Sequence, residues 1–343
     1  MRIFISLLLL VISGYSPAMG NDGFGALGVG GIIVGKTGNI ALAKEVLNIS
    51  YKRISVEYDF VNESTSAITS DIVFPLPAYP ATPNESGVIA FGQPSDFNVS
   101  VNGHSVEFDT KVMATIIGGE DVTDKLRSIG LSDKQIALFP FDNAPQDAGY
   151  GLHLSAAQVA ALTKQKLLWD DGVSPTWDIN VTYQWKQTFA AGSSIHVSHA
   201  YTPFIAEGTA GGFQGVDSKE FLSEFCPTDS QIGALNRLFS AKKNLDVYGE
   251  VPGTIVKYVL TTANTWKDGI RDFTLKVTTF SPDETVSLCF PEPLAKVSEN
   301  TYAARLFNFK PKTDLSIYFG NIAAAKVPVP QYGVAPQFSN SKE

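Results

Sequence analysis

The chain has 343 residues, of which 44% are hydrophobic and 17% charged, and this apolar content excludes a wholly disordered protein. Its 34 acidic and 26 basic residues give a formal net charge of −8. The sequence therefore lacks the excess of positive charge with which nucleic-acid-binding proteins neutralise phosphates. We expect a folded, acidic protein that binds no nucleic acid, with a length typical of two domains.

The first twenty residues have the pattern of a secretory signal peptide. Arg2 supplies a positive charge, residues 3–12 form an apolar run, and Ala18 and Gly20 are small residues before a cleavage site. A membrane anchor is the alternative, but the apolar run has about half of the roughly 20 residues that a spanning helix needs. We therefore assign residues 1–20 to a signal peptide and expect an exported protein with no integral membrane segment after cleavage.

Cys226 and Cys289 are the only cysteines in the chain. An oxidising compartment favours their pairing, and closing a loop of about 64 residues would stabilise the fold by roughly 4 kcal/mol. The alternatives are a redox pair or a metal site. Neither cysteine belongs to a Cys-x-x-Cys motif, and no cluster of histidines accompanies them. We expect a structural disulfide between Cys226 and Cys289, with no metal site and no cofactor.

Residues 21–205 have the alternating pattern of an antiparallel β-sandwich. Apolar and polar residues alternate over residues 46–60, which predicts one strand with a buried face. Asn102-Gly103 lies between two short alternating runs and predicts a type I′ hairpin. Residues 119–175 instead have helical spacing, and we interpret them as a helical insertion. Further strands are predicted over residues 68–75, 177–189 and 194–201.

A second β domain, with helices at its start, is predicted over residues 206–325. Helical spacing occurs within residues 216–245, first over 218–225 and then over 229–241. Strands are predicted over residues 254–262, 273–280, 285–290, 303–309 and 315–319. Residues 326–343 are expected to form a flexible tail. The predicted fold class is mainly β with α (α+β), made of two antiparallel β-sandwich-like domains.

Two glycine-rich motifs match nucleotide-binding patterns by their letters. Residues 23–28 match GxGxxG, and residues 30–37 match the P-loop pattern GxxxxGK[ST]. Both chemistries need a buried strand before the glycines and a helix after them. The first motif follows the cleavage site directly, and the second contains Ile32, Ile33 and Val34 where a phosphate-binding loop would lie. We interpret this segment as a glycine-rich edge strand and expect no nucleotide ligand.

The candidate binding residues lie on two predicted strands. His196 and His199 are three positions apart, so on a strand they face opposite sides and do not share a metal ion. His199 shares its face with Tyr201, and Trp185 is a candidate for a sugar-stacking platform. We single out His199, Tyr201 and Trp185 as candidate binding residues. Packing in the core is the commoner role for such residues and remains the alternative.

Candidate carboxylates for a hydrolase are Asp170 and Asp171, together with Glu57 and Asp59. Glycoside hydrolysis needs two acids that face each other across a cleft. Glu57 and Asp59 share one predicted strand face, where solvation is the alternative role. No Gly-x-Ser-x-Gly motif is present, so no catalytic residue is assigned.

Short motifs along almost the whole mature chain are similar to those of one family. Examples are Val46-Leu-Asn-Ile-Ser50, Phe74-Pro-Leu-Pro77, Tyr183-Gln-Trp185 and Ser287-Leu-Cys289. Together they resemble a family of exported bacterial proteins, domain of unknown function 4424. The resemblance implies a mostly β fold and a periplasmic or secreted location in a bacterium. It implies no known activity.

Our leading functional hypothesis is an exported, non-catalytic envelope protein, a β-rich binding or assembly module. Its partner is expected to be an envelope protein or glycan of unknown identity. The alternative is an exported hydrolase that acts on cell-envelope glycan. Whether the protein is an enzyme stays open at this point, with a non-enzymatic role favoured.

Overall fold

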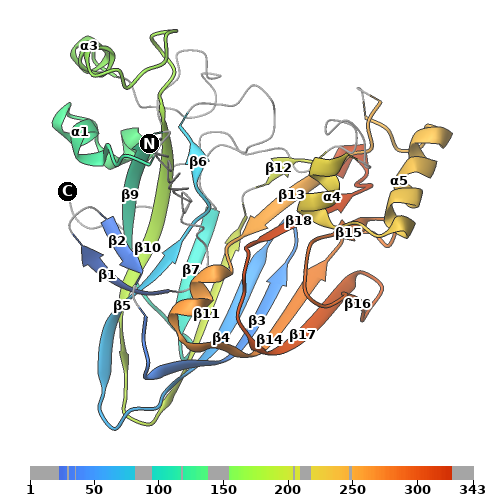
Figure 1. Ribbon diagram of the computed structural model, residues 1–343, viewed down its shortest axis with the longest axis horizontal. Helices are drawn as coiled ribbons and strands as arrows, with labels where there is room; N and C mark the ends of the chain where they lie inside the picture. Colours follow the sequence, from blue (N-terminus) through green and yellow to red (C-terminus); the bar gives the residue numbers. More distant parts are fainter. Residues whose placement is uncertain are drawn as a thin grey trace, which may run out of the picture.

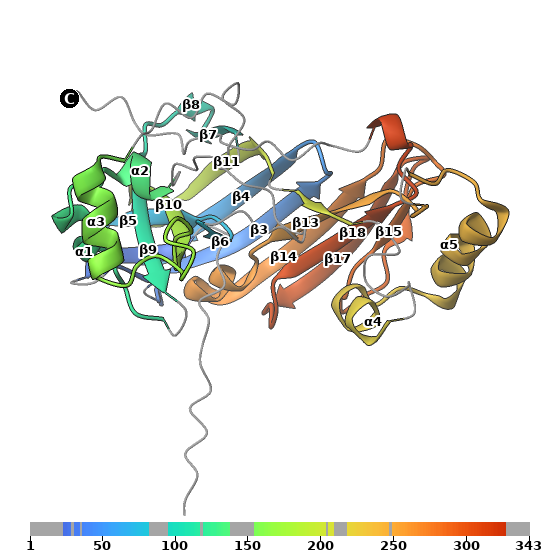
Figure 2. The same cartoon turned by 90° about the horizontal axis from the view of Figure 1, so that it is seen from above.

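The computed structural model of the protein is an elongated arrangement of three β-sheets with helices at both ends (Figures 1 and 2). The structure describes residues 23–28, 31–34, 36–81, 95–116, 119–137, 154–203, 205–208, 218–246 and 249–326. The predicted signal peptide lies outside the described residues, as do residues 327–343 of the predicted tail.

Eight strands form a central sheet in the order β16-β17-β14-β3-β4-β11-β7-β8. Their bounds are β3 (Ile40–Ile49), β4 (Ile54–Asn62), β7 (Ser95–Val101), β8 (His104–Ser105), β11 (Ser194–Thr202), β14 (Lys267–Thr278), β16 (Ala295–Lys296) and β17 (Thr301–Phe309). Neighbouring strands are antiparallel except β14, which pairs with β3 in parallel. The boundary predicted between residues 205 and 206 therefore falls between strands that contribute to one continuous sheet.

Two smaller sheets cover one face of the central sheet. The N-terminal sheet has the order β2-β1-β5-β10-β6, with β9 also paired to β10. The C-terminal sheet has the order β12-β13-β18-β15. The bounds are β1 (Gly23–Gly28), β2 (Gly31–Val34), β5 (Ile68–Pro75), β6 (Tyr79–Pro80), β9 (Asp109–Ile116), β10 (Trp177–Phe189), β12 (Ala206–Glu207), β13 (Gly253–Tyr258), β15 (Thr285–Ser287) and β18 (Leu315–Gly320).

Contacts from β4 show that both smaller sheets pack on the same face. The ring of Phe60 lies 6.1 Å from that of Phe189 on β10. Two residues earlier, the hydroxyl of Tyr58 lies 3.2 Å from that of Tyr258 on β13. Side chains two positions apart on a strand share a face, so one buried surface of the central sheet serves both partners. The result is a main hydrophobic core that extends through both halves of the chain.

The α-helices of the described residues lie at the two ends of the molecule (Figure 2). Three of them, α1 (Thr123–Ser128), α2 (Asp133–Ala137) and α3 (Ala156–Lys164), occur between β9 and β10. The other two, α4 (Lys219–Phe225) and α5 (Asp229–Ala241), cover the outer face of the C-terminal sheet, and short 3₁₀ helices span η2 (Thr261–Thr265) and η3 (Ala324–Lys326). Reciprocal hydrogen bonds between Thr228 and Gln231 satisfy free N–H groups at the start of α5.

The predicted fold class, mainly β with α, is confirmed. The hairpin at Asn102-Gly103 is also confirmed, with φ angles of 49° and 79°. The prediction of one strand over residues 46–60 is wrong, because β3 and β4 are separated by a turn. The Ser50 hydroxyl accepts a hydrogen bond from the Arg53 N–H at 3.0 Å, and this local bond reverses the chain.

An ion-pair group joins the loop after β4 to β14. The carboxylate of Glu63 lies 2.5 Å from Lys267 Nζ and 2.6 Å from Arg271 Nη2. Hydrogen bonds from Lys267, and then from Arg271, hold the pKa of Glu63 below its ordinary value. The contribution of Glu63 to the free energy of unfolding is therefore largest when its carboxylate is charged.

We expect Glu63→Gln to lower the urea midpoint of unfolding near neutral pH. A carboxylate with a lowered folded-state pKa stabilises the fold above its unfolded pKa, and this contribution is lost as the pH falls through the folded pKa. The difference between wild type and Glu63→Gln should therefore shrink in acid. Urea titrations of both proteins at neutral and acidic pH measure this difference in midpoint. An equal difference at both pH values would show that the charged carboxylate of Glu63 does not stabilise the fold.

Candidate functional site

The structure brings the three candidate binding residues together inside the core. His199 and Tyr201 lie on β11, and Trp185 lies on β10 of the facing sheet, with 5.3 Å between the ring centroids of Trp185 and His199. Phe74 and Phe97 contact both His199 and Tyr201. The exposed fractions are only 2% for His199, 3% for Tyr201 and 4% for Trp185. This burial favours the alternative role that the sequence left open, which is packing between the sheets.

His196 and the candidate carboxylates lie on outer surfaces. The prediction that His196 and His199 face opposite sides is confirmed, because His196 is exposed and its Nδ1 lies 2.8 Å from Asp59 Oδ1. The carboxylate of Asp171 accepts hydrogen bonds from the N–H groups of Val173 and Ser174. Bonds from Ser174, and then Val173, lower the pKa of Asp171, so this carboxylate shapes an exposed turn as an anion.

A groove of about 1030 Å³ lies between α5 and the strand ends of the C-terminal sheet. One wall is a face of α5, where Ala234, Arg237, Leu238 and Ala241 recur at helical spacing. The opposite wall is the segment over residues 281–285, between β14 and β15, together with residues that follow β18. Figure 2 shows α5 at the end of the molecule opposite to α1 and α3.

A chain of side-chain amides connects the two walls. Asn244, just after α5, donates from Nδ2 to Asn321 Oδ1 at 2.8 Å and to the Ile322 carbonyl at 3.1 Å. Asn321, just after β18, donates in turn to the Asp283 carbonyl at 2.8 Å. Asn244 and Asn321 have φ angles of 50° and 58°, a left-handed conformation that asparagine tolerates. The amides fix the end of α5 against both strand ends.

The groove carries cations without acidic partners. Arg237, Lys243 and Lys326 line it, and none of the carboxylates in the described parts of the chain lies within 4.0 Å of their charged nitrogens. The Glu284 carboxylate also belongs to the lining, but it is buried and accepts hydrogen bonds from the Tyr51 hydroxyl at 3.0 Å and the Phe280 N–H at 2.9 Å. Burial, and then the charge of Glu284, raises the pKa of Tyr51.

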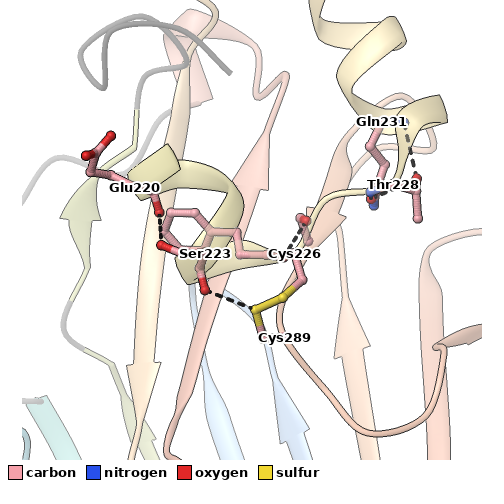
Figure 3. Close-up of a disulfide and its surroundings, with 8 residues drawn as sticks. Glu220, Ser223, Cys226, Thr228, Gln231 and Cys289 are labelled. Atoms are coloured by element: carbon pink, nitrogen blue, oxygen red, sulfur yellow. Dashed lines mark hydrogen bonds between the residues drawn. A yellow bond between two sulfur atoms is a disulfide. The ribbon is translucent and has the colours of Figure 1, made fainter. Parts of the chain in front are cut away.

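The predicted disulfide between Cys226 and Cys289 is confirmed, with 4.9 Å between the Cα atoms (Figure 3). Cys226 is the residue at the end of α4, and Cys289 follows β15. Two hydrogen bonds accompany the bridge: Ser287 Oγ donates to the Phe225 carbonyl at 2.8 Å, and Gln231 Nε2 donates to the Val286 carbonyl. The bridge thus ties the end of α4, three residues before α5 begins, to the segment after β15, close in the chain to both walls of the groove.

The sequence analysis did not identify this groove. Its strongest local signal is the second face of α5, where Arg237 lies among small residues and not on the apolar stripe that packs inward. The strand wall comes from residues about 50 and 85 positions further along the chain, so only the folded structure shows that the two walls meet.

We expect Trp185→Ala to lower the free energy of unfolding by about 3–5 kcal/mol, because it empties a large volume in the core. Trp169→Ala is the matched control, since Trp169 is 49% exposed. It should change stability by no more than about 0.5 kcal/mol. Urea denaturation measures both. A Trp185 variant as stable as the control would show that the ring does not hold the sheets together.

Replacing both Cys226 and Cys289 with serine should lower the free energy of unfolding by about 4 kcal/mol, since the unfolded chain regains the entropy of an open loop. Denaturant titration of the double variant, beside oxidised and reduced wild type, measures this. Reduced wild type should resemble the variant. Equal stability of the variant and the oxidised protein would contradict a stabilising role for the bridge.

In the parts of the chain that the structure describes, no helix has the length and hydropathy to span a bilayer. No group of three or more His, Cys, Asp or Glu side chains that could hold a metal ion occurs among the described residues.

Comparison with known proteins identifies the family of this chain. A search of curated proteins finds no match. Among solved structures, the chain is similar to a Legionella pneumophila protein described as a "putative nutrient binding protein", at 16% identity and a TM-score of 0.38, over 88% of this chain and 72% of that chain. A likeness at this TM-score carries no functional argument. The model of the family "Domain of unknown function (DUF4424)" matches residues 20–318, so the chain belongs to this family.

Proposed function

We propose that the protein is exported and acts in the bacterial cell envelope as a non-catalytic binding or assembly module. Its partner occupies the groove between α5 and the C-terminal sheet. The observation that carries this proposal is the construction of the groove, whose walls are joined by hydrogen-bonded amides, with the Cys226–Cys289 disulfide holding the neighbouring segments together. A binding surface held in place in this way loses little conformational entropy when a partner binds.

Two features support export. Residues 1–20 combine a positive start, a short apolar run and small residues before the expected cleavage site. The Cys226–Cys289 disulfide persists most readily in an oxidising compartment such as the periplasm. Both features are independent of what the groove binds.

The carboxylates of the groove support binding over hydrolysis. Asp283 and Glu284 are neighbours in the sequence and belong to the same wall. Both oxygens of Glu284 already accept hydrogen bonds from Tyr51 and Phe280. A glycosidase needs an acid and a second carboxylate on opposite sides of the scissile bond. Two adjacent acids, one of them buried in a structural contact, do not supply that arrangement.

The experiment expresses the full chain in a Gram-negative host and recovers the protein from the periplasm, where it should begin at Asn21. Immobilised mature protein is then incubated with a solubilised envelope fraction. Ala241→Trp places a large ring in the groove and should abolish retention of the partner, whereas Ala160→Trp, at an exposed alanine of α3, should leave retention unchanged. The partner should be recovered chemically intact.

Three results would contradict the proposal. Precursor that stays in the cytoplasm would contradict export. Equal retention by Ala241→Trp and Ala160→Trp would show that the groove is not the binding site. Release of reducing ends from peptidoglycan by wild type, but not by Ala241→Trp, would favour the alternative function as a hydrolase acting on envelope glycan.

A further inference from the structure

We propose that the groove recognises an extended, acidic peptide segment of its partner, with Arg237, Lys243 and Lys326 binding the carboxylates. This inference rests on the proposed function, because it names the chemical class of the partner at the same site. It goes beyond that function because the proposed function leaves the chemical class of the partner open.

Arg237 differs from three arginines elsewhere in the protein, which make ion pairs. Arg127 lies 2.8 Å from Asp133, Arg271 lies 2.6 Å from Glu63, and Arg305 lies 2.7 Å from Asp272. Among the described arginines, Arg53 and Arg237 have no carboxylate of the described residues within 4.0 Å, and of these two Arg237 belongs to the groove lining. Arg237 is exposed within the groove and has no such partner among the described residues. Its planar fork remains available for a carboxylate from outside.

The three cations line the groove from two sides. Arg237 belongs to α5, Lys243 follows that helix, and Lys326 ends the 3₁₀ helix after β18. Among the described residues of the lining, the acids are Asp283, which is exposed, and Glu284, whose carboxylate is held by Tyr51 and Phe280. The described part of the lining thus has three cations against one freely solvated carboxylate. A ligand with several carboxylates matches this arrangement better than a neutral ligand.

The side chains that line the groove favour a peptide over a glycan. None of the described residues that line the groove is aromatic, so the lining offers no ring face on which a sugar could stack. Asn244 uses both hydrogens of Nδ2 within the protein, but its Oδ1 accepts no hydrogen bond from the described residues. That oxygen is an acceptor for a main-chain N–H. Leu238 and the alanines of α5 supply an apolar surface for short side chains.

The test measures binding of three labelled probes to the mature, oxidised protein by fluorescence anisotropy. The first is a peptide of alternating glutamate and serine, the second has glutamine in place of glutamate, and the third is oligogalacturonate, a carboxylated glycan. We expect the acidic peptide to bind most tightly, and added salt to weaken its binding. Arg237→Gln and Lys243→Gln should each weaken it about two- to fivefold, and the double variant about tenfold.

Lys164→Gln is the matched control, because Lys164 is an exposed lysine at the end of α3, far from the groove. It should leave the affinity unchanged. Urea unfolding of each variant should match wild type, since the substituted side chains are exposed. Equal binding of the acidic and the glutamine peptide, or equal affinities of Arg237→Gln and Lys164→Gln, would overturn the inference.

Tighter binding of oligogalacturonate than of the acidic peptide would also overturn it, in favour of an acidic glycan. The outcome is separable from that of the proposed function. If Ala241→Trp abolishes retention of the envelope partner while the acidic peptide does not bind, the groove is a binding site for another chemical class. If Ala241→Trp retains the partner, the proposed function itself is wrong, whatever the probes show.

Discussion

The parallel pairing of β14 with β3 is the constraint on which the rest of the architecture depends. Leu275 lies opposite Leu47, and Val277 lies opposite Ile49, with all four side chains at most 1% exposed. Through this pairing the later part of the chain extends the sheet begun by the earlier part. The two smaller sheets consequently share one supporting face and one core, and neither half of the chain provides the whole of that core by itself.

The C-terminal sheet is buried on both faces, and this burial fixes the position of the groove relative to the central sheet. On β18, Ile317 and Phe319 belong to the main core, whereas Tyr318 between them packs with Phe221 and Phe225 of α4. Alternation along one strand therefore fixes the helices against a sheet that is itself fixed against the central sheet. The disulfide reinforces the same contact. The shape of the groove between α5 and these strand ends is therefore set by the packing of the core. This packing explains how the exposed side chains that line the groove can keep a defined arrangement.

The sequence patterns predicted those features of the fold that depend on residues close together in the chain, such as strand bounds and helix starts. The bounds of β10 follow from the alternation of apolar and polar residues from Trp177 to Trp185 and the apolar Phe189 at its end. Helix α5 begins after Thr228, whose side chain caps it. The disulfide was predictable because the chain has two cysteines. The turn after β3 was missed because Ser50 continues the alternating pattern while its hydroxyl closes the turn. Strand pairing between distant segments leaves no mark in a local pattern, so neither the β14–β3 pairing nor the groove was predictable.

The two candidate sites, the aromatic cluster around His199 and the groove beside α5, differ in burial and charge and therefore in physical role. The rings around His199 have the residue types of a ligand platform, but they lie where the sheets exclude solvent, so their contribution is to stability. The cations of the groove are exposed on a protein whose net charge is −8. At distances beyond the Debye length of about 8 Å, salt screens the repulsion between this net charge and an acidic partner. When the partner is in contact with the protein, the nearest charges dominate the electrostatic energy of the interaction. An acidic segment is therefore attracted where unpaired cations are concentrated and repelled over acidic surface, which gives orientation as well as affinity.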